Sequence, residues 1–274
     1  MFLLVGTTSC SASSQSSFST WIWNTSTIKK NPAQLVQTMK DKQIDRVYLQ
    51  INRDIPFQAY QQFIKNAESA DIAVYALDGN RTWATSGQTE YEIFWDWCAR
   101  YQQQVPEEER FSGIHLDVEP YLLPDWGENQ RNIVKQYEEM VNDAASRAHS
   151  LNVPLGVDLP FWFDEIDSVN NESLAASLIQ AADEVTIMAY RNIAEGANGL
   201  IQLTKTERQL GNEFSTQIEI GLETMPSKEG KYVSFANKGE AYMMEEINKM
   251  RQAMPDESLR FSIHHFDSWV NMKK

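Results

Sequence analysis

Short apolar runs alternate with longer amphipathic stretches along most of this chain of 274 residues. The short runs have the length of β-strands, and most are rich in valine, isoleucine or aromatic residues, which favours buried strands. Eight such runs follow a serine-rich start, at residues 20–23, 46–51, 72–77, 112–119, 154–159, 184–190, 217–222 and 260–265.

The stretches between these runs predict helices. Asn31 and Pro32 form a capping residue followed by proline at the first helical position, which is a typical helix start. Apolar residues recur at helical spacing after this start and at 56–70, 91–104, 129–150 and 243–254. Strands that alternate with helices in this way predict one (β/α)8 TIM barrel of the α/β class, over residues 20–274.

The fourth run is the most informative, because active sites of such barrels lie at the carboxyl ends of the strands. In 112–119 the apolar residues face the helices, while His115, Asp117 and Glu119 face the barrel interior. Two carboxyl groups about 6.6 Å apart along a strand raise the proton affinity of at least one of them. Pro120 ends the strand and leaves Glu119 at its lip, where a raised pKa favours general acid catalysis. A purely structural polar network is the alternative interpretation.

The fourth run, SGIHLDVE, resembles the strand-four signature Asp-Gly-x-Asp-x-Asp-x-Glu of the family-18 glycoside hydrolases, the chitinase-like barrels. Gly113, Asp117 and Glu119 match the pattern. Ser112 and His115 replace its first two aspartates.

The sixth run carries a second match. Met188 and Tyr190 resemble the family's Met-x-Tyr strand, and Arg191 stands where an aspartate usually follows. The resemblance implies that Glu119 donates a proton to the glycosidic oxygen and that Asp117 orients the substrate's acetamido group, which acts as the nucleophile. It also implies that Tyr190 hydrogen-bonds to that group.

The residue types also predict acid-catalysed bond cleavage without the family resemblance. One carboxylic acid beside one ionised neighbour, with a phenol opposite, can protonate a leaving group and stabilise developing charge. Other strand ends offer carboxylates and a histidine that suit sugar hydroxyls, although each of them alone is as well explained by a structural hydrogen bond. The predicted substrate-binding residues are His115, Trp23, Asp78, Asp158, Trp162, Met188, Arg191, Glu223 and His264.

Aromatic residues also follow many predicted strands, which suits the stacking of sugar rings along an extended glycan. The predicted rim contains Trp21, Trp23, Trp83, Tyr121, Trp126, Phe161, Trp162 and Trp269.

The amino-acid composition limits the classes of partner that the protein can bind. Acidic residues outnumber basic ones by 38 to 24, and a net charge of −14 disfavours nucleic acid and anionic membranes. Two cysteines, Cys10 and Cys98, cannot form a disulfide framework, and Cys98 is predicted to lie in the core. No dinucleotide fingerprint, phosphate-binding loop or paired metal-ligand spacing is present, so no cofactor is expected.

Residues 1–19 are predicted to be a signal remnant and serine-rich tether. The apolar run at 1–10 lacks the basic start and the longer apolar core of a full signal peptide, but it ends in small residues and Cys10, as the tail of a lipoprotein signal with a lipidated cysteine does. This hypothesis places the protein outside the cytoplasmic membrane, with a lipid anchor at Cys10. A frayed N-terminus is the alternative.

The leading hypothesis is therefore an extracytoplasmic glycoside hydrolase with Glu119 as general acid and a carbohydrate as its partner. The loss of signature acids at Ser112 and His115 supports a second hypothesis, an inactive barrel that binds glycans or a cell-wall component. A metal-assisted hydrolase of amide or ester bonds is a third, because His115, His264 and several carboxylates are predicted near one mouth. The sugar, the linkage and the oligomeric state are open.

Overall fold

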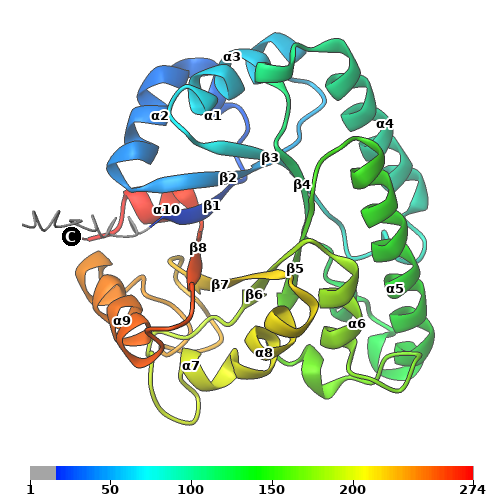
Figure 1. The fold of residues 1–274 in the computed structure, drawn as a ribbon, viewed down its shortest axis with the longest axis vertical. Helices are drawn as coiled ribbons and strands as arrows, with labels where there is room; N and C mark the ends of the chain where they lie inside the picture. Colours follow the sequence, from blue (N-terminus) through cyan, green and yellow to red (C-terminus); the bar gives the residue numbers. More distant parts are fainter. Residues whose placement is uncertain (1–16, 274) are drawn as a thin grey trace, which may run out of the picture.

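The computed structural model describes residues 17–273, and eight parallel strands close into a barrel within them (Figure 1). Each strand pairs with the next along the chain, and the last returns to the first, so that Phe18 lies opposite Phe261. The predicted (β/α)8 barrel is therefore confirmed. The strands are β1 (Phe18–Ile22), β2 (Ile44–Gln50), β3 (Ala73–Asp78), β4 (Gly113–Leu116), β5 (Leu155–Pro160), β6 (Glu184–Met188), β7 (Gln217–Glu223) and β8 (Arg260–His264).

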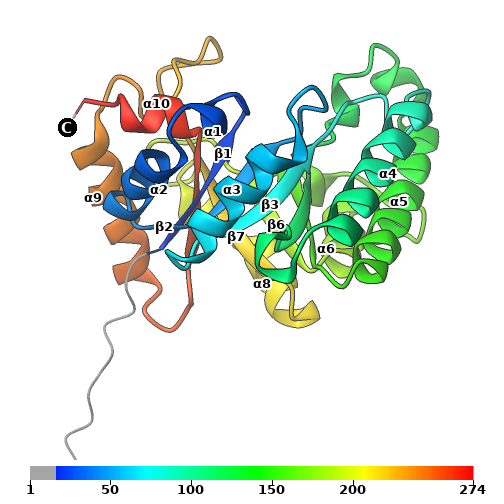
Figure 2. The ribbon, with the colours of Figure 1, turned by 90° about the horizontal axis from the view of Figure 1, so that it is seen from above.

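Helices surround the barrel (Figures 1 and 2). The short helices α1, α7 and α10 have no counterpart among the predicted stretches, and neither do α6, which is apolar on almost every side, and α8, which is mostly polar. The helices are α1 (Thr27–Lys30), α2 (Pro32–Asp41), α3 (Phe57–Glu68), α4 (Gln88–Gln104), α5 (Trp126–Ser150), α6 (Leu174–Ala181), α7 (Leu200–Leu203), α8 (Lys205–Phe214), α9 (Glu240–Ala253) and α10 (Phe266–Val270), with 3-10 turns η1 (Glu107–Glu109), η2 (Pro120–Leu122) and η3 (Phe163–Glu165).

The alternation within each strand separates two cores. In β2, Val47 and Leu49 are fully buried against the helices. Tyr48, between them, joins Trp21 and Tyr75 in a separate apolar cluster inside the barrel. This division follows from the pleat of a strand, which sends successive side chains to opposite faces.

A buried ionic network fills the amino-terminal end of the barrel. Glu219 of β7 lies 2.9 Å from Arg46 Nη1 and 2.9 Å from Arg260 Nε, and it accepts a hydrogen bond of 2.8 Å from the Tyr48 hydroxyl. Burial alone raises the pKa of Glu219, but the two arginines outweigh it and lower the pKa to about 2. The negative charge of Glu219 at this end is therefore paired with two arginines.

Two of the boundaries that differ from the sequence-based expectation bear on the predicted tether and on the predicted site. β1 begins at Phe18, inside the predicted tether, while Cys10 lies outside the described residues. β4 ends at Leu116, so Asp117 and Glu119 follow the strand instead of lying within it. No helix within 17–273 combines the length and the apolar character needed to cross a membrane.

Candidate active site

The chain after β4 carries the two predicted catalytic carboxyls to the mouth of the barrel. The backbone N–H of Asp117 donates to the Asp78 carbonyl oxygen at 3.1 Å, which holds the ends of β3 and β4 together. Gly79 makes this approach possible, because a Cβ there would lie 1.9 Å from the Asp117 carbonyl oxygen. Asp117 and Glu119 are both half-buried, so each keeps some surface open at the mouth.

Glu119 has the environment of a proton donor. Burial raises the pKa of its carboxyl, and the negative charge of Asp158 adds to this effect. The Tyr121 hydroxyl donates a hydrogen bond to Glu119 Oε1, which lowers the pKa without reversing the net rise. Because Oε1 accepts this bond, Oε2 is the oxygen left to carry a transferable proton.

The environment of Asp117 favours its neutral form, whereas the sequence-based expectation is an ionised neighbour of Glu119. Burial, followed by the charges of Asp158 and Glu119, raises the pKa of Asp117 well above its usual range. Its buried Oδ1 has no hydrogen-bond partner among residues 17–273. A charged Asp117 would therefore be both desolvated and repelled by two carboxyl groups.

Asp158, the third carboxyl of this group, lies against side chains of β1 and β4. The Trp21 indole N–H donates to Oδ2 at 3.0 Å, and His115 Nε2 lies 2.9 Å from Oδ1. His115 in turn stacks on Tyr48, with ring centroids 3.8 Å apart. His115 and Asp158 are only 1% and 2% exposed, so they lie below the surface of the mouth, and their contact with substrate stays a prediction. They support the carboxyls above them.

A chain of three side chains crosses the opposite side of the mouth. The Trp23 indole N–H donates to His264 Nε2 at 3.0 Å, and His264 Nδ1 lies 3.0 Å from Glu223 Oε2. An indole nitrogen can only donate, so Nε2 accepts and Nδ1 carries the hydrogen toward Glu223. These two contacts fix the orientation of the His264 ring.

Tyr190 lies beside this chain, with its ring 5.9 Å from that of His264. Burial, followed by the charges of Asp158 and Glu223, raises the pKa of the Tyr190 hydroxyl well above its usual range. Tyr190 therefore remains a phenol that can donate a hydrogen bond.

The remaining predicted substrate-binding residues lie at different depths in the barrel mouth. Asp78 accepts a hydrogen bond of 2.9 Å from Gln50, and Trp162 packs edge-on against Tyr121 with centroids 5.2 Å apart. Met188 is buried at the end of β6, where it contributes to the wall and offers little surface to a ligand. A cavity of about 420 Å³ opens beside Trp23, lined by residues 23–25 and 50–54.

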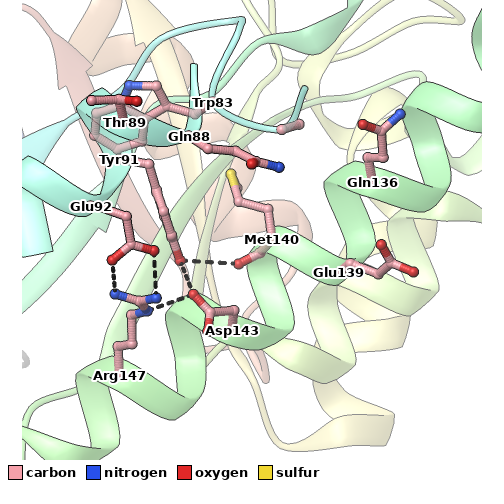
Figure 3. Close-up of a pocket in the computed structure, with 11 residues that line it drawn as sticks. Trp83, Gln88, Thr89, Tyr91, Glu92, Gln136, Glu139, Met140, Asp143 and Arg147 are labelled. Carbon is pink, nitrogen blue, oxygen red and sulfur yellow. Dashed lines mark hydrogen bonds and ion pairs between the residues drawn. The ribbon is translucent and has the colours of Figure 1, made fainter. Parts of the chain in front are cut away.

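Two of the predicted rim aromatics do not belong to the mouth. Trp83 lines a cavity of about 410 Å³ between α4 and α5, where Tyr91 donates to Asp143 at 2.7 Å (Figure 3). Trp269 packs edge-on against Phe18 at 5.6 Å and is 1% exposed. A position after a strand therefore does not by itself place an aromatic side chain at the barrel mouth.

Tyr48 and Tyr121 were not among the predicted site residues, although Tyr121 was expected at the rim. A signal for Tyr48 exists in the sequence, because Arg46, Tyr48 and Gln50 alternate with apolar residues and so share the inward face of β2. The bond from Tyr121 to Glu119 has no such signal, since it depends on the turn η2.

Cys98 is fully buried, as predicted. Within 17–273, no group of three or more histidine, cysteine, aspartate or glutamate side chains is arranged to hold a metal ion.

No protein-family model and no curated protein matches this sequence. Several solved structures, however, are similar to this one. A family GH18 chitinase from Pseudoalteromonas aurantia is similar with a TM-score of 0.53 and 12% identity, over 93% of this chain and 97% of that one. A GH18 chitinase mutant from Cycas revoluta, solved in complex with (GlcNAc)4, is similar with a TM-score of 0.52 and 11% identity, over 94% and 96%.

The spore cortex-lytic enzyme SleL of Bacillus megaterium is similar with a TM-score of 0.51 and 12% identity, over 94% of this chain and 72% of that one. At such identities the likeness establishes the fold. The chain thus has a divergent, chitinase-like (β/α)8 barrel, as the strand-four resemblance implied.

Proposed function

We propose that the protein is a glycoside hydrolase in which Glu119 is the general acid. The observation that carries this proposal is the Glu119 carboxyl itself. It is half-buried at the barrel mouth, its pKa is raised, and Tyr121 occupies only one of its two oxygens. Such a group stays protonated closer to neutral pH than an ordinary glutamate and can deliver its proton to a glycosidic oxygen.

The raised pKa of Asp117 supports this role for Glu119. When Glu119 gives up its proton it becomes negative, and an already negative Asp117 nearby would oppose that change. A protonated Asp117 avoids this repulsion and can also donate a hydrogen bond to the substrate. The Tyr190 hydroxyl supplies a second donor to a substrate oxygen that gains charge during the reaction.

The substrate class follows from the same groups and from the comparisons. A carboxyl group and a phenol next to the acid suit an acetamido group that acts as the internal nucleophile, as in substrate-assisted hydrolysis, because a carboxyl oxygen can accept from the acetamido N–H and the phenol can position its carbonyl oxygen. The similar structures include chitinases, one in complex with (GlcNAc)4. We therefore assign the protein a glycan that contains N-acetylated hexosamines, with Glu119 as acid, Asp117 as orienting group and Tyr190 as stabilising donor.

The test is hydrolysis of N-acetylglucosamine oligomers and of their aryl glycosides by the wild type and by Glu119→Gln. The variant should lose about 10²- to 10⁴-fold in rate on the oligomers, because it cannot transfer a proton. The loss should be smaller on aryl glycosides, whose leaving groups need less protonation. Glu90→Gln, at an exposed position of α4, is the matched control and should retain the full rate.

Two outcomes would contradict the proposal. Equal losses on both substrate types, together with a lower melting temperature, would make Glu119 a structural carboxyl. Binding of the oligomers without hydrolysis by the wild type would favour the inactive glycan-binding barrel.

A further inference from the structure

Arg191 is held rigidly at the rim, directly after Tyr190. Its guanidinium lies between the rings of Phe161 and Tyr232, 5.1 Å from each centroid. Its Nη1 donates to the Tyr190 carbonyl oxygen at 2.9 Å. Stacking on two aromatic faces restricts the side chain in advance of any ligand.

This arginine has no carboxylate partner within the described residues 17–273. The comparably buried Arg46, Arg208 and Arg260 each form an ion pair with an acidic side chain. Arg191 forms none, and its buried Nε has no hydrogen-bond acceptor. A half-buried cation normally has an anionic partner, and in a protein with a net charge of −14 such partners are abundant.

The loop at 224–239, between β7 and α9, connects Arg191 to the proposed active site. Tyr232 in this loop stacks on Arg191, and Glu229 in the same loop contributes to the raised pKa of Glu119. Asn192 fixes the loop, because its side-chain amide donates to the carbonyl oxygens of Lys231 at 2.7 Å and Ser234 at 2.8 Å. Arg191 and Glu119 therefore border the same mouth without pairing with each other.

We propose that Arg191 binds a carboxylate carried by the substrate, so that the preferred substrate is an acidic glycan and not a neutral one. The planar fork of a guanidinium matches the two oxygens of a carboxylate, and such a charge-assisted pair is stronger than hydrogen bonds to neutral sugar hydroxyls. Tyr232 is 55% exposed and offers its outer surface to the neighbouring sugar ring. The inference rests on the proposed function in one respect, that the ligand is a glycan.

The experiment compares tetrasaccharides that share one backbone. The first is neutral (GlcNAc)4, the second carries a lactyl ether with a free carboxylate on alternate sugars, and the third is the methyl ester of the second. Binding is measured by calorimetry on Glu119→Gln protein, to prevent turnover. The acid should bind about 10-fold or more tightly than its ester, as a charge-assisted, two-pronged hydrogen bond requires, and added salt should reduce the difference.

Substitutions then test whether Arg191 causes the preference for the acid over its ester. Arg191→Gln should abolish the difference between acid and ester, while Arg191→Lys should retain part of it, because it keeps the charge and loses the fork. Arg81→Gln is the matched control, since Arg81 is an exposed arginine in the loop after β3. It should leave the preference unchanged. Melting temperatures identify any variant that has unfolded.

Equal binding of acid and ester, absence of binding to all three compounds, or a preference that persists in folded Arg191→Gln would each overturn the proposal. Hydrolysis by the wild type separates this failure from that of the proposed function. Cleavage of (GlcNAc)4 without any preference for the acid would remove only the role of Arg191. Selective binding of the acid without cleavage would remove the enzyme and keep that role.

Discussion

The buried carboxyl of Glu207 in α8 should lower the free energy of unfolding of the protein as the pH rises above the acidic range. Its side chain is 1% exposed, and neither carboxyl oxygen has a hydrogen-bond partner on another described residue. Burial, with a smaller contribution from the charge of Asp164, raises the pKa of Glu207 to about 8. Replacement by glutamine keeps the shape and removes the ability to ionise.

The size of the effect follows from proton linkage. Between pH 4.5 and about 8 the unfolded chain releases the Glu207 proton while the folded protein keeps it. The free energy of unfolding of the wild type therefore falls by about 1.4 kcal/mol per pH unit from this group alone. At pH 7 the accumulated loss is about 3 kcal/mol, and at pH 8 it approaches about 5 kcal/mol.

Urea unfolding at pH 4.5, 6, 7 and 8 gives the free energy of unfolding of Glu207→Gln and of the wild type. The difference between the two values measures this loss, because the contributions of all other titrating groups are the same in both proteins and cancel. The difference should grow in favour of the variant as the pH rises. Glu213→Gln, at an exposed position of the same helix, should show no such trend. Parallel stability curves for Glu207→Gln and wild type across this range would refute the reasoning.

Two further predictions concern the active site and the N-terminus. Asp158→Asn should lower the pKa of Glu119 and move the basic limb of the kcat/KM profile to lower pH, whereas Tyr121→Phe should move it to higher pH. Shifts in the same direction would contradict these assignments. We also propose a lipid anchor at Cys10. With a complete export signal restored, the protein should fractionate with membranes and Cys10→Ser should release it, while a wild type that stays soluble in the cytosol would exclude the anchor.

The alternation of the strands was readable from the sequence because it is local. Val47 and Leu49 face the helices and Tyr48 faces the interior as a direct consequence of the two-residue period of a strand. Asp117 and Glu119 could be placed near the barrel mouth for the same reason, with Pro120 marking the end of the run. Such features depend on neighbours along the chain.

Sequence reasoning failed where the outcome depended on distant residues. Trp83 follows a strand yet packs between α4 and α5, because the direction of a loop depends on what the helices leave open. Arg191 could be identified as a departure from the family pattern, but its isolation from carboxylates required the packing of Phe161 and Tyr232 around it.

The carboxyl groups at the barrel mouth also show which features are local in the sequence and which depend on the fold. The alternation of residues 112–119 is enough to predict that Asp117 and Glu119 are inward carboxyls at one strand end. That the pKa of Asp117 is raised, and that Asp158 accepts a hydrogen bond from Trp21, follows from the folded structure alone. The reason is physical: a pKa depends on burial and on charges within a few ångströms, and those neighbours come from β1, β4 and β5, which are far apart in the chain.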